Sequence, residues 1–303
     1  AFWLALAEKR RTIWVLCGPA TGLALLAKFT ALLLGPIFIL LTILHVIQYR
    51  KEAASVLKGL VIAGGVSVLV VGAGYNLTFN PLLYLDGLCK VYTTGAPGYQ
   101  YYLFGEASEK PWWYYHLVVF ALKTPVPVLL LIVLAIGGIF IQKENRLDTG
   151  FLAIPAILML LVSCFDQTNL GFRRILPAVP FLLLLTGHVT KALRSRSTKW
   201  VYACLVLITV LSSILAHPHY LSFFNQIAGG QDLPAFARWQ AENRDAGQLK
   251  LMYFGNVRPE HYGVRALPIP EQDILRPLPG YYAISAHTLA WLPKIKQRTG
   301  QDI

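Results

Sequence analysis

Charged side chains are scarce in this sequence. They make up 14% of its 303 residues, whereas 55% are hydrophobic and the mean hydropathy is +0.53. So little charge excludes an ordinary soluble domain. Cysteine is scarce too. Of the four cysteines, Cys17, Cys164 and Cys204 fall inside apolar runs and Cys89 stands alone, so the sequence predicts no disulfide framework.

Acidic residues are also few, 15 against 27 lysines and arginines, which gives a net charge of +12. The basic residues lie in short loops between apolar runs, which argues against a nucleic-acid partner. The sequence lacks paired carboxylates on a recognisable scaffold, a metal-ligand spacing, a GxSxG motif and a glycine-rich phosphate loop. Metal binding by His217 and His219, which flank a proline, is an alternative that the spacing favours only weakly. No metal and no cofactor is implied.

Long apolar runs dominate the first two thirds of the chain. They are about 16–20 residues long, the length that a bilayer-spanning helix needs. They predict seven spans after the end of an earlier helix at residues 1–7, namely 12–27, 31–48, 59–79, 124–141, 150–165, 175–190 and 200–216. The expected fold class is therefore mainly α, a polytopic membrane protein with about seven transmembrane helices.

The charges of the loops predict the orientation. Four alternate loops carry four acidic side chains and twelve basic ones: Lys9, Arg10, Arg11, Arg50, Lys51, Lys58, Lys143, Arg146, Lys191, Arg194, Arg196 and Lys199. By the positive-inside rule these loops are cytoplasmic. The remaining loops and everything after residue 217 are then extracytoplasmic, and the protein is a multi-pass protein of the inner or plasma membrane.

An aromatic stretch occupies residues 98–125, within an expected outer loop at residues 80–123. It holds Tyr99, Tyr101, Tyr102, Trp112, Trp113, Tyr114 and Tyr115. Such rings favour the membrane–water interface, so we expect an interfacial segment, with a plain aromatic belt and a snorkelling lysine as the alternative. Thr124 as N-cap and Pro125 at the first helical position then predict the start of a new span.

The last part of the chain differs from the rest. Residues 1–216 are expected to form the transmembrane domain, and residues 217–303 a small extracytoplasmic α/β unit. Helices are predicted at 232–245 and 287–297, and strands at 249–254 and 281–285.

Four cations fall on the expected outer face, where basic residues are least common: Lys28, Lys123, Arg173 and Arg174. Each alone can be a topological anchor. Together they predict an anionic ligand, for which a lipid phosphate is the natural candidate. Like charges converge only where an anion compensates them. We therefore predict that Lys28 and the two arginines meet at one anionic site beneath the aromatic loop.

The aromatic stretch also supplies candidate substrate-binding residues, namely Tyr101, Tyr102, Glu106, Trp112 and Trp113. Glu106 lies between the tyrosine and tryptophan clusters, where its carboxylate can accept hydrogen bonds from sugar hydroxyls. The alternative is a solvated loop carboxylate.

Six segments resemble, in order, the bacterial dolichyl-phosphate-mannose-protein mannosyltransferase-like glycosyltransferases (GT-C, family 39-like). They are GLALLAKFTALLLGP (22–36), YYLFGEASEKPWWYYHLVVFALKTPVP (101–127), NLGFRRILPAVPF (169–181), AHPHYLSFFNQIAGG (216–230), YFGNVRPEHYG (253–263) and PGYYAISA (279–286). The resemblance implies transfer of a sugar, mannose-like, from a polyprenyl- or dolichyl-phosphate donor to an exported protein or glycan at the outer face. It also implies that Lys28 helps to hold the donor phosphate.

Two departures from that family matter. The family's catalytic carboxylate lies in a loop that would precede Ala1, so no catalytic residue is expected in this chain, which is then a C-terminal fragment. Relatives also carry a longer stretch before Gln231. The alternative function is a non-catalytic membrane protein or transporter that binds lipid phosphate. It predicts ionisable or helix-breaking residues near the bilayer midplane.

Overall fold

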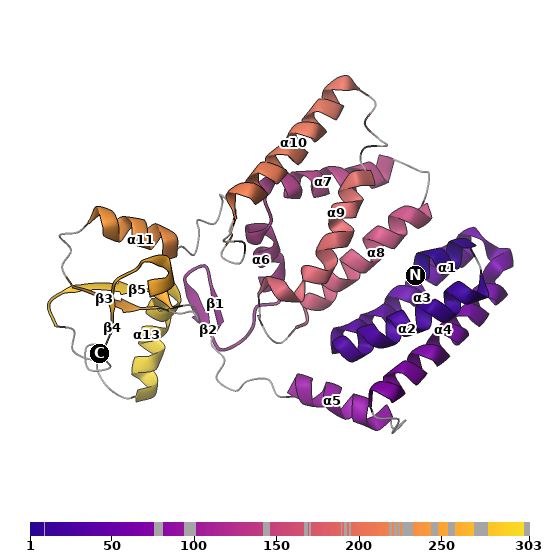
Figure 1. The fold of residues 1–303 in the computed structure, drawn as a ribbon, viewed down its shortest axis with the longest axis horizontal. Coiled ribbons are helices and arrows are strands. Elements are labelled where there is room, and N and C mark those ends of the chain that lie inside the picture. The colour runs from indigo at the N-terminus through magenta and orange to yellow at the C-terminus, as the bar shows by residue number, and fades with distance from the viewer. Residues whose placement is uncertain are drawn as a thin grey trace.

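The computed structural model describes residues 1–8, 10–75, 81–93, 101–141, 146–166, 169, 171–188, 190, 193, 195–217, 220, 223, 225, 233–243, 248–253, 258–269 and 278–299. The described part is mostly helical. Its first ten helices are α1 (Phe2–Glu8), α2 (Arg11–Ala27), α3 (Leu34–Gln48), α4 (Ala53–Gly74), α5 (Pro81–Thr93), α6 (Tyr115–Lys123), α7 (Val126–Ile141), α8 (Arg146–Ser163), α9 (Val179–His188) and α10 (Arg196–Leu215). Figure 1 shows these helices on one side of the molecule and a smaller α/β unit on the other.

Several of the helices match a membrane in length and composition. Within the described residues, three stretches are long and apolar enough to cross a bilayer: Phe29–Gln48, Arg50–Gly74 and Arg196–Leu215. The first two include the short 3-10 turns η1 (Phe29–Leu33) and η2 (Arg50–Glu52). A fourth span results if α6 and α7, which are bent by 116°, form one broken span. The apolar helical character is as expected, whereas the total of about seven spans stays a prediction because α2, α8 and α9 are shorter.

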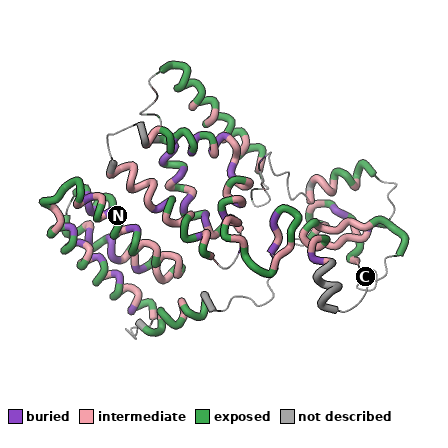
Figure 2. The backbone as a smooth tube through the Cα atoms, turned by 180° about the vertical axis from the view of Figure 1, so that it is seen from behind, coloured by how far each residue is buried: buried purple, intermediate pink, exposed green. Residues whose placement is uncertain are grey.

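Small residues on α2 let it lie close to α4. A Cβ atom added to Gly18 would lie 2.5 Å from the Cβ of Val66, and one added to Gly22 would lie 2.7 Å from the Cβ of Val70. A larger side chain at either glycine would push the helices apart. Figure 2 shows the buried positions along the inward faces of the helices. They form two main clusters, one around Phe2, Leu6, Trp14, Ile37 and Leu41, the other around Val128, Ile132, Ala156 and Leu182.

The region expected to be an outer loop at residues 80–123 contains more regular structure than the sequence predicts. Besides α5 and α6 it contains a hairpin of β1 (Tyr101–Leu103) and β2 (Glu106–Ser108), paired antiparallel with Leu103 opposite Glu106. The two-residue turn has positive φ at Phe104 (50°) and Gly105 (89°). This is the backbone of a type I′ turn, whose twist suits a tight hairpin. Within its described residues, 81–93 and 101–123, the expected interfacial loop contains a helix, a hairpin and a second helix, while residue 80 and residues 94–100, with Tyr99, lie outside the described part.

The α/β unit contains the elements predicted for it. They are α11 (Leu233–Glu242), β3 (Leu249–Met252), β5 (Tyr281–Ile284) and α13 (Ala286–Thr299). Helix α11 and the two strands are shorter than predicted, and α13 is longer. The sequence did not predict the two-residue strand β4 (Leu267–Pro268) or the 3-10 turn η8 (Pro259–Tyr262). The sheet is parallel with the order β4-β3-β5, and Leu249 of β3 lies opposite Tyr281 of β5. Its buried core includes Leu249, Val264 and Trp291.

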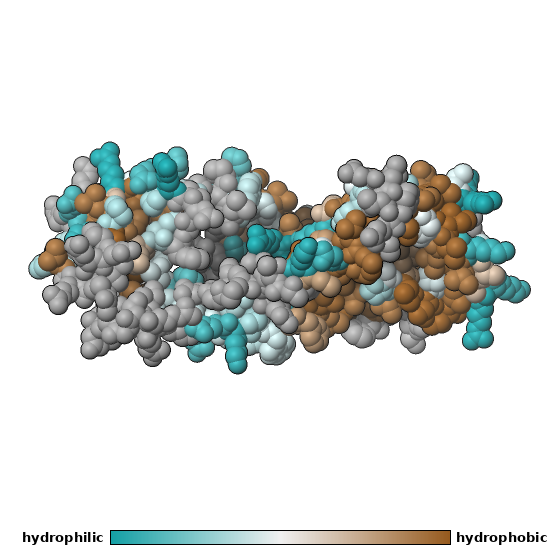
Figure 3. All heavy atoms as spheres, turned by 90° about the horizontal axis from the view of Figure 1, so that it is seen from below, coloured by the Kyte–Doolittle hydropathy of each residue, from teal (hydrophilic) through white to brown (hydrophobic). Residues whose placement is uncertain are grey.

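Many large apolar side chains remain exposed on the helical part. Helix α10 has no buried residue, and Ile214 and Leu215 near its end are 62% and 84% exposed. Figure 3 shows hydrophobic side chains gathered over the helical part of the molecule. A soluble protein rarely exposes so much contiguous apolar surface, and a lipid bilayer covers such a surface without cost. The exposure agrees with the expected membrane character.

Candidate functional site

The chain breaks sharply between α6 and α7. Helix α6 ends at Lys123, Thr124 is extended (φ −98°, ψ 132°), and α7 begins at Val126. A residue before proline avoids helical geometry, so Thr124 leaves the helix and Pro125 starts the next one. The backbone N–H groups of Val128 and Leu129 donate to the carbonyl of Pro125, as the predicted helix start requires.

One detail of that prediction is wrong. Thr124 was expected to cap α7 with its side chain, but its buried Oγ1 has no hydrogen-bond partner among the described residues. Its backbone N–H instead donates to Phe120 and so closes α6. The Thr124 hydroxyl therefore remains available beside the N-terminus of α7, and Lys123, which is partly buried, directly precedes it.

Asn225, from the segment after α10, holds this break from outside. Its Nδ2 donates to the carbonyls of Ala121 (2.6 Å) and Thr124 (2.9 Å), and its backbone N–H donates to the carbonyl of Leu122 (2.8 Å). Asn225 is only 2% exposed. The last carbonyls of a helix have no partner within it, and here an asparagine more than a hundred residues away supplies one. Nothing in the sequence singled out Asn225.

The end of α8 and the turn η3 (Phe172–Arg174) pack against α6. Rings of Phe120 and Phe172 stack with centroids 6.4 Å apart. Arg174 Nε lies 3.1 Å from Asp166 Oδ2, and the two side chains are 24% and 17% exposed. Arg174 thus has an internal carboxylate partner that the sequence reasoning did not assign to it. Its neighbour Arg173 is exposed.

A buried histidine lies in the same region. His116 on α6 is fully buried, and neither ring nitrogen has a hydrogen-bond partner among the described residues. Asn169, 5% exposed, has an amide group that likewise finds none there. Buried polar groups without partners are uncommon. This corner of the helical part is therefore unusually rich in unused hydrogen-bonding capacity.

The predicted substrate-binding residues fall into two groups. Tyr101 is buried in the hairpin, and the ring of Tyr102 makes an edge contact with His287 of α13, with centroids 5.7 Å apart. The carboxylate of Glu106 and the ring of Trp113 (66% exposed) face the outside, while Trp112 is partly exposed. The hairpin therefore joins the helical part to the α/β unit, and only part of the aromatic set is accessible to a substrate.

Lys28 lies at a second helix break, between α2 and η1. It is exposed and extended, and its backbone bonds to Ala24 and Ala31. The next residue, Phe29, makes a ring contact with Tyr84 of α5 at 5.1 Å. In Figure 1 the C-terminal ends of α2 and α8 both lie on the side of the helical part that faces the hairpin. No described contact joins Lys28 to the arginines of η3, so their convergence stays a prediction.

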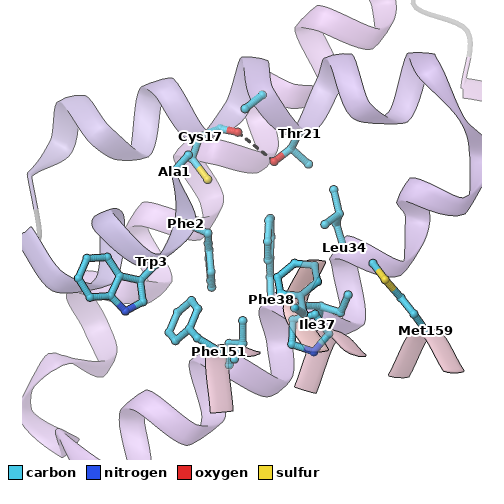
Figure 4. Close-up of a pocket in the computed structure, with 14 residues that line it drawn as sticks. Ala1, Phe2, Trp3, Cys17, Thr21, Leu34, Ile37, Phe38, Phe151 and Met159 are labelled. Carbon is cyan, nitrogen blue, oxygen red and sulfur yellow. Dashed lines mark hydrogen bonds between the residues drawn. The ribbon is translucent and has the colours of Figure 1, made fainter. Parts of the chain in front are cut away.

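An apolar cavity of about 310 Å³ lies between α1, α2, α3, α8 and α9. Figure 4 shows Phe2, Phe38 and Phe151 pointing into it. The hydroxyl of Thr21, also at its wall, donates to the backbone carbonyl of Cys17 at 2.9 Å. A cavity whose polar atoms are already paired stays dry and accepts apolar groups.

The described residues contain no group of three side chains placed to hold a metal ion, and His219 lies outside them. Comparisons of the chain with protein-family models, with curated proteins and with solved structures find no match. The functional proposal therefore draws on the geometry of the α6–α7 break and its surroundings, and on the resemblance of the sequence segments.

Proposed function

We propose that this chain is part of a membrane glycosyltransferase that moves a mannose-like sugar from a polyprenyl- or dolichyl-phosphate donor to an exported protein or glycan at the outer face. The observation that carries the proposal is the α6–α7 break. There a partly buried lysine, a buried hydroxyl without a partner and the start of a 16-residue helix occur in consecutive positions.

A phosphate group suits this position. The N-terminus of α7 carries the partial positive charge of a helix start, which attracts anions. It offers few N–H donors, because Pro125 and Pro127 have none and the N–H groups of Val128 and Leu129 donate to the carbonyl of Pro125. Lys123 can add a positive charge, although its partial burial lowers the pKa of its ammonium group, and the hydroxyl of Thr124 can donate one further hydrogen bond. Asp166 balances the charge of Arg174, and Arg173 is exposed, so in this proposal Lys123 and Arg173 attract the phosphate.

The apolar cavity supports a lipid-linked substrate. A cavity of about 150 Å³ holds one benzene ring, so a volume near 310 Å³ has room for about two five-carbon isoprene units. The donor's hydrocarbon chain would otherwise lie among the exposed apolar side chains of the helices. Both environments favour a substrate with a long apolar tail and a charged phosphate.

The chemistry needs charge stabilisation more than a special nucleophile. The acceptor oxygen bonds to the anomeric carbon, and the bond from that carbon to the phosphate oxygen breaks with its electron pair going to the phosphate. The acceptor's proton passes to a base, which we assign to no residue of this chain. Lys123 and the helix N-terminus stabilise the negative charge that develops on the departing phosphate. In this proposal the exposed Trp113 and Glu106 contact the sugar or the acceptor.

A second candidate function has one specific observation in its favour. Transporters often build their substrate sites from broken helices, and the pair α6–α7 is such a break, bent by 116°. A transporter that binds a lipid phosphate would use the same lysine without cleaving the donor. The two candidates differ in the fate of the sugar–phosphate bond.

A labelled donor separates them. Membranes containing the full-length protein are incubated with polyprenyl-phosphate mannose that carries the label in the sugar. A transferase moves the label from the organic-solvent phase into protein or glycan and leaves free polyprenyl phosphate. Label that stays in the lipid but crosses the bilayer identifies a transporter and contradicts the proposal, as does label that neither moves nor crosses.

A further inference from the structure

The α6–α7 break is held by a residue from a distant segment. Asn225 brackets Lys123 with three hydrogen bonds, to the carbonyls of residues 121 and 122 before it and of residue 124 after it. The amide group of Asn225 is the donor in two of these bonds. One –NH₂ group with two hydrogens can therefore hold both sides of the break at once.

This arrangement matters because the break alone does not fix an angle. Once Thr124 leaves the helix, the carbonyls at the end of α6 lose their partners and the two helices can pivot about the linking residues. Asn225 is 2% exposed, so water does not compete for these carbonyls. Its contacts define one geometry of the break, and with it the position of the lysine that the break carries.

We propose that Asn225 is a positioning residue. It fixes the angle between α6 and α7 and thereby holds Lys123 at the anion site. Asn225 lies in the chain between α10 and the α/β unit, so a residue distant in sequence sets the geometry of the break. The inference rests on the proposed function for the role of Lys123, but the effect on the helix angle is independent of it.

Substitutions can separate the donor function of Asn225 from its size. Asn225→Asp keeps the shape but offers only acceptor oxygens to two carbonyls, so it should disturb the break most. Asn225→Ala removes both side-chain bonds and keeps the backbone bond. Asn225→His restores one N–H donor and should recover part of the effect. The matched control is Asn243→Ala, because Asn243 also bonds a carbonyl near a helix end, that of Trp239 at 2.8 Å, far from this break.

The first measurement is the distance between spin labels on the two helices. Cysteines at Leu117 on α6 and Val133 on α7, both exposed, carry the labels in a chain whose four native cysteines are replaced by alanine. The wild-type Asn225 should give one narrow distance distribution. Asn225→Asp and Asn225→Ala should broaden or shift it, whereas Asn243→Ala should not. An unchanged distribution in both Asn225 variants overturns the proposal.

The second measurement is binding of polyprenyl phosphate by the full-length protein in lipid nanodiscs. Asn225→Ala should weaken binding about tenfold, which corresponds to about 1.4 kcal/mol of binding free energy. In a Lys123→Met background the same change should have little further effect, because Asn225 acts through Lys123. Equal losses in both backgrounds would reduce Asn225 to a stabilising residue and contradict the proposal.

The two measurements fail in distinguishable ways. If the wild-type protein shows no preference for polyprenyl phosphate over polyprenol, the proposed function is wrong, and the label distances still decide whether Asn225 holds the break. If the distances change but the affinity of a binding-competent protein does not, the link between Asn225 and Lys123 is refuted.

Discussion

The ion pair between Asp166 and Arg174 offers the sharpest quantitative test of the region beside the break. Its two charged atoms are 3.1 Å apart, and the side chains are only 17% and 24% exposed. At an effective dielectric constant near 20, such a pair attracts by about 5 kcal/mol before desolvation is subtracted. Breaking a fully buried pair costs about 3–5 kcal/mol and an exposed one about 0–1 kcal/mol. This partly exposed pair should lie between those limits.

We therefore expect Asp166→Asn to lower the free energy of unfolding by about 1–3 kcal/mol, because it leaves the Arg174 charge without its carboxylate partner. Arg174→Gln should have a similar effect, and the double variant should cost less than the sum of the two. Reversible unfolding in mixed micelles measures all four proteins. The control is Arg173→Gln, since Arg173 is exposed and its loss should change stability by less than about 0.5 kcal/mol.

The same substitutions also predict an effect on the binding of polyprenyl phosphate. Asp166→Asn frees one positive charge beside α6, so it should leave polyprenyl-phosphate affinity unchanged or raise it, even though it lowers stability. Additive effects of the two single variants on stability would show that Asp166 and Arg174 do not interact in the folded protein. A loss of phosphate affinity in Asp166→Asn would refute the charge argument.

Two further predictions concern packing and topology. Gly18→Ala should destabilise the protein by about 1–3 kcal/mol because its Cβ would lie 2.5 Å from Val66, whereas Gly64→Ala, with nothing within 4 Å of its Cβ, should be neutral or stabilising by up to about 1 kcal/mol in the same unfolding assay. A single cysteine at Glu109 should react with an impermeant reagent on intact cells and one at Arg196 should not. The reverse pattern would invert the expected topology and move the candidate site to the cytoplasmic face.

Much of the helical part follows from local sequence. Apolar runs predict α2, α3, α4 and α10, because a continuous run of about 16–20 apolar residues has the length of a bilayer-spanning helix. The break at Lys123-Thr124-Pro125 could also be predicted, since proline restricts the residue before it. In the α/β unit, the short apolar and aromatic segments LKLMYF (249–254) and YYAIS (281–285) predicted both main strands.

The contacts that define the candidate site could not be predicted in the same way. The side chain of Asn225 donates to the carbonyls of Thr124 and Ala121, which lie 101 and 104 positions earlier in the chain. No local sequence pattern signals such a pairing. The pairing of Arg174 with Asp166 depends on how the chain turns between α8 and η3. The hairpin was missed because its turn residues are Phe104 and Gly105, whereas Asn-Gly or Asp-Gly is the usual signal for two positive φ angles.

The central claim is that Lys123 at the α6–α7 break recognises a lipid phosphate. Its most direct test compares the affinities of the full-length protein in nanodiscs for polyprenyl phosphate and for polyprenol, which lacks the phosphate. The wild-type protein should prefer the phosphate, and Lys123→Met should reduce that preference by about tenfold to a hundredfold, as expected when a charge-assisted contact of ~1.5–3 kcal/mol is lost. Lys110→Met, at an exposed lysine near the hairpin, should leave it unchanged. Equal binding of both lipids, or the same preference after Lys123→Met, would contradict the account.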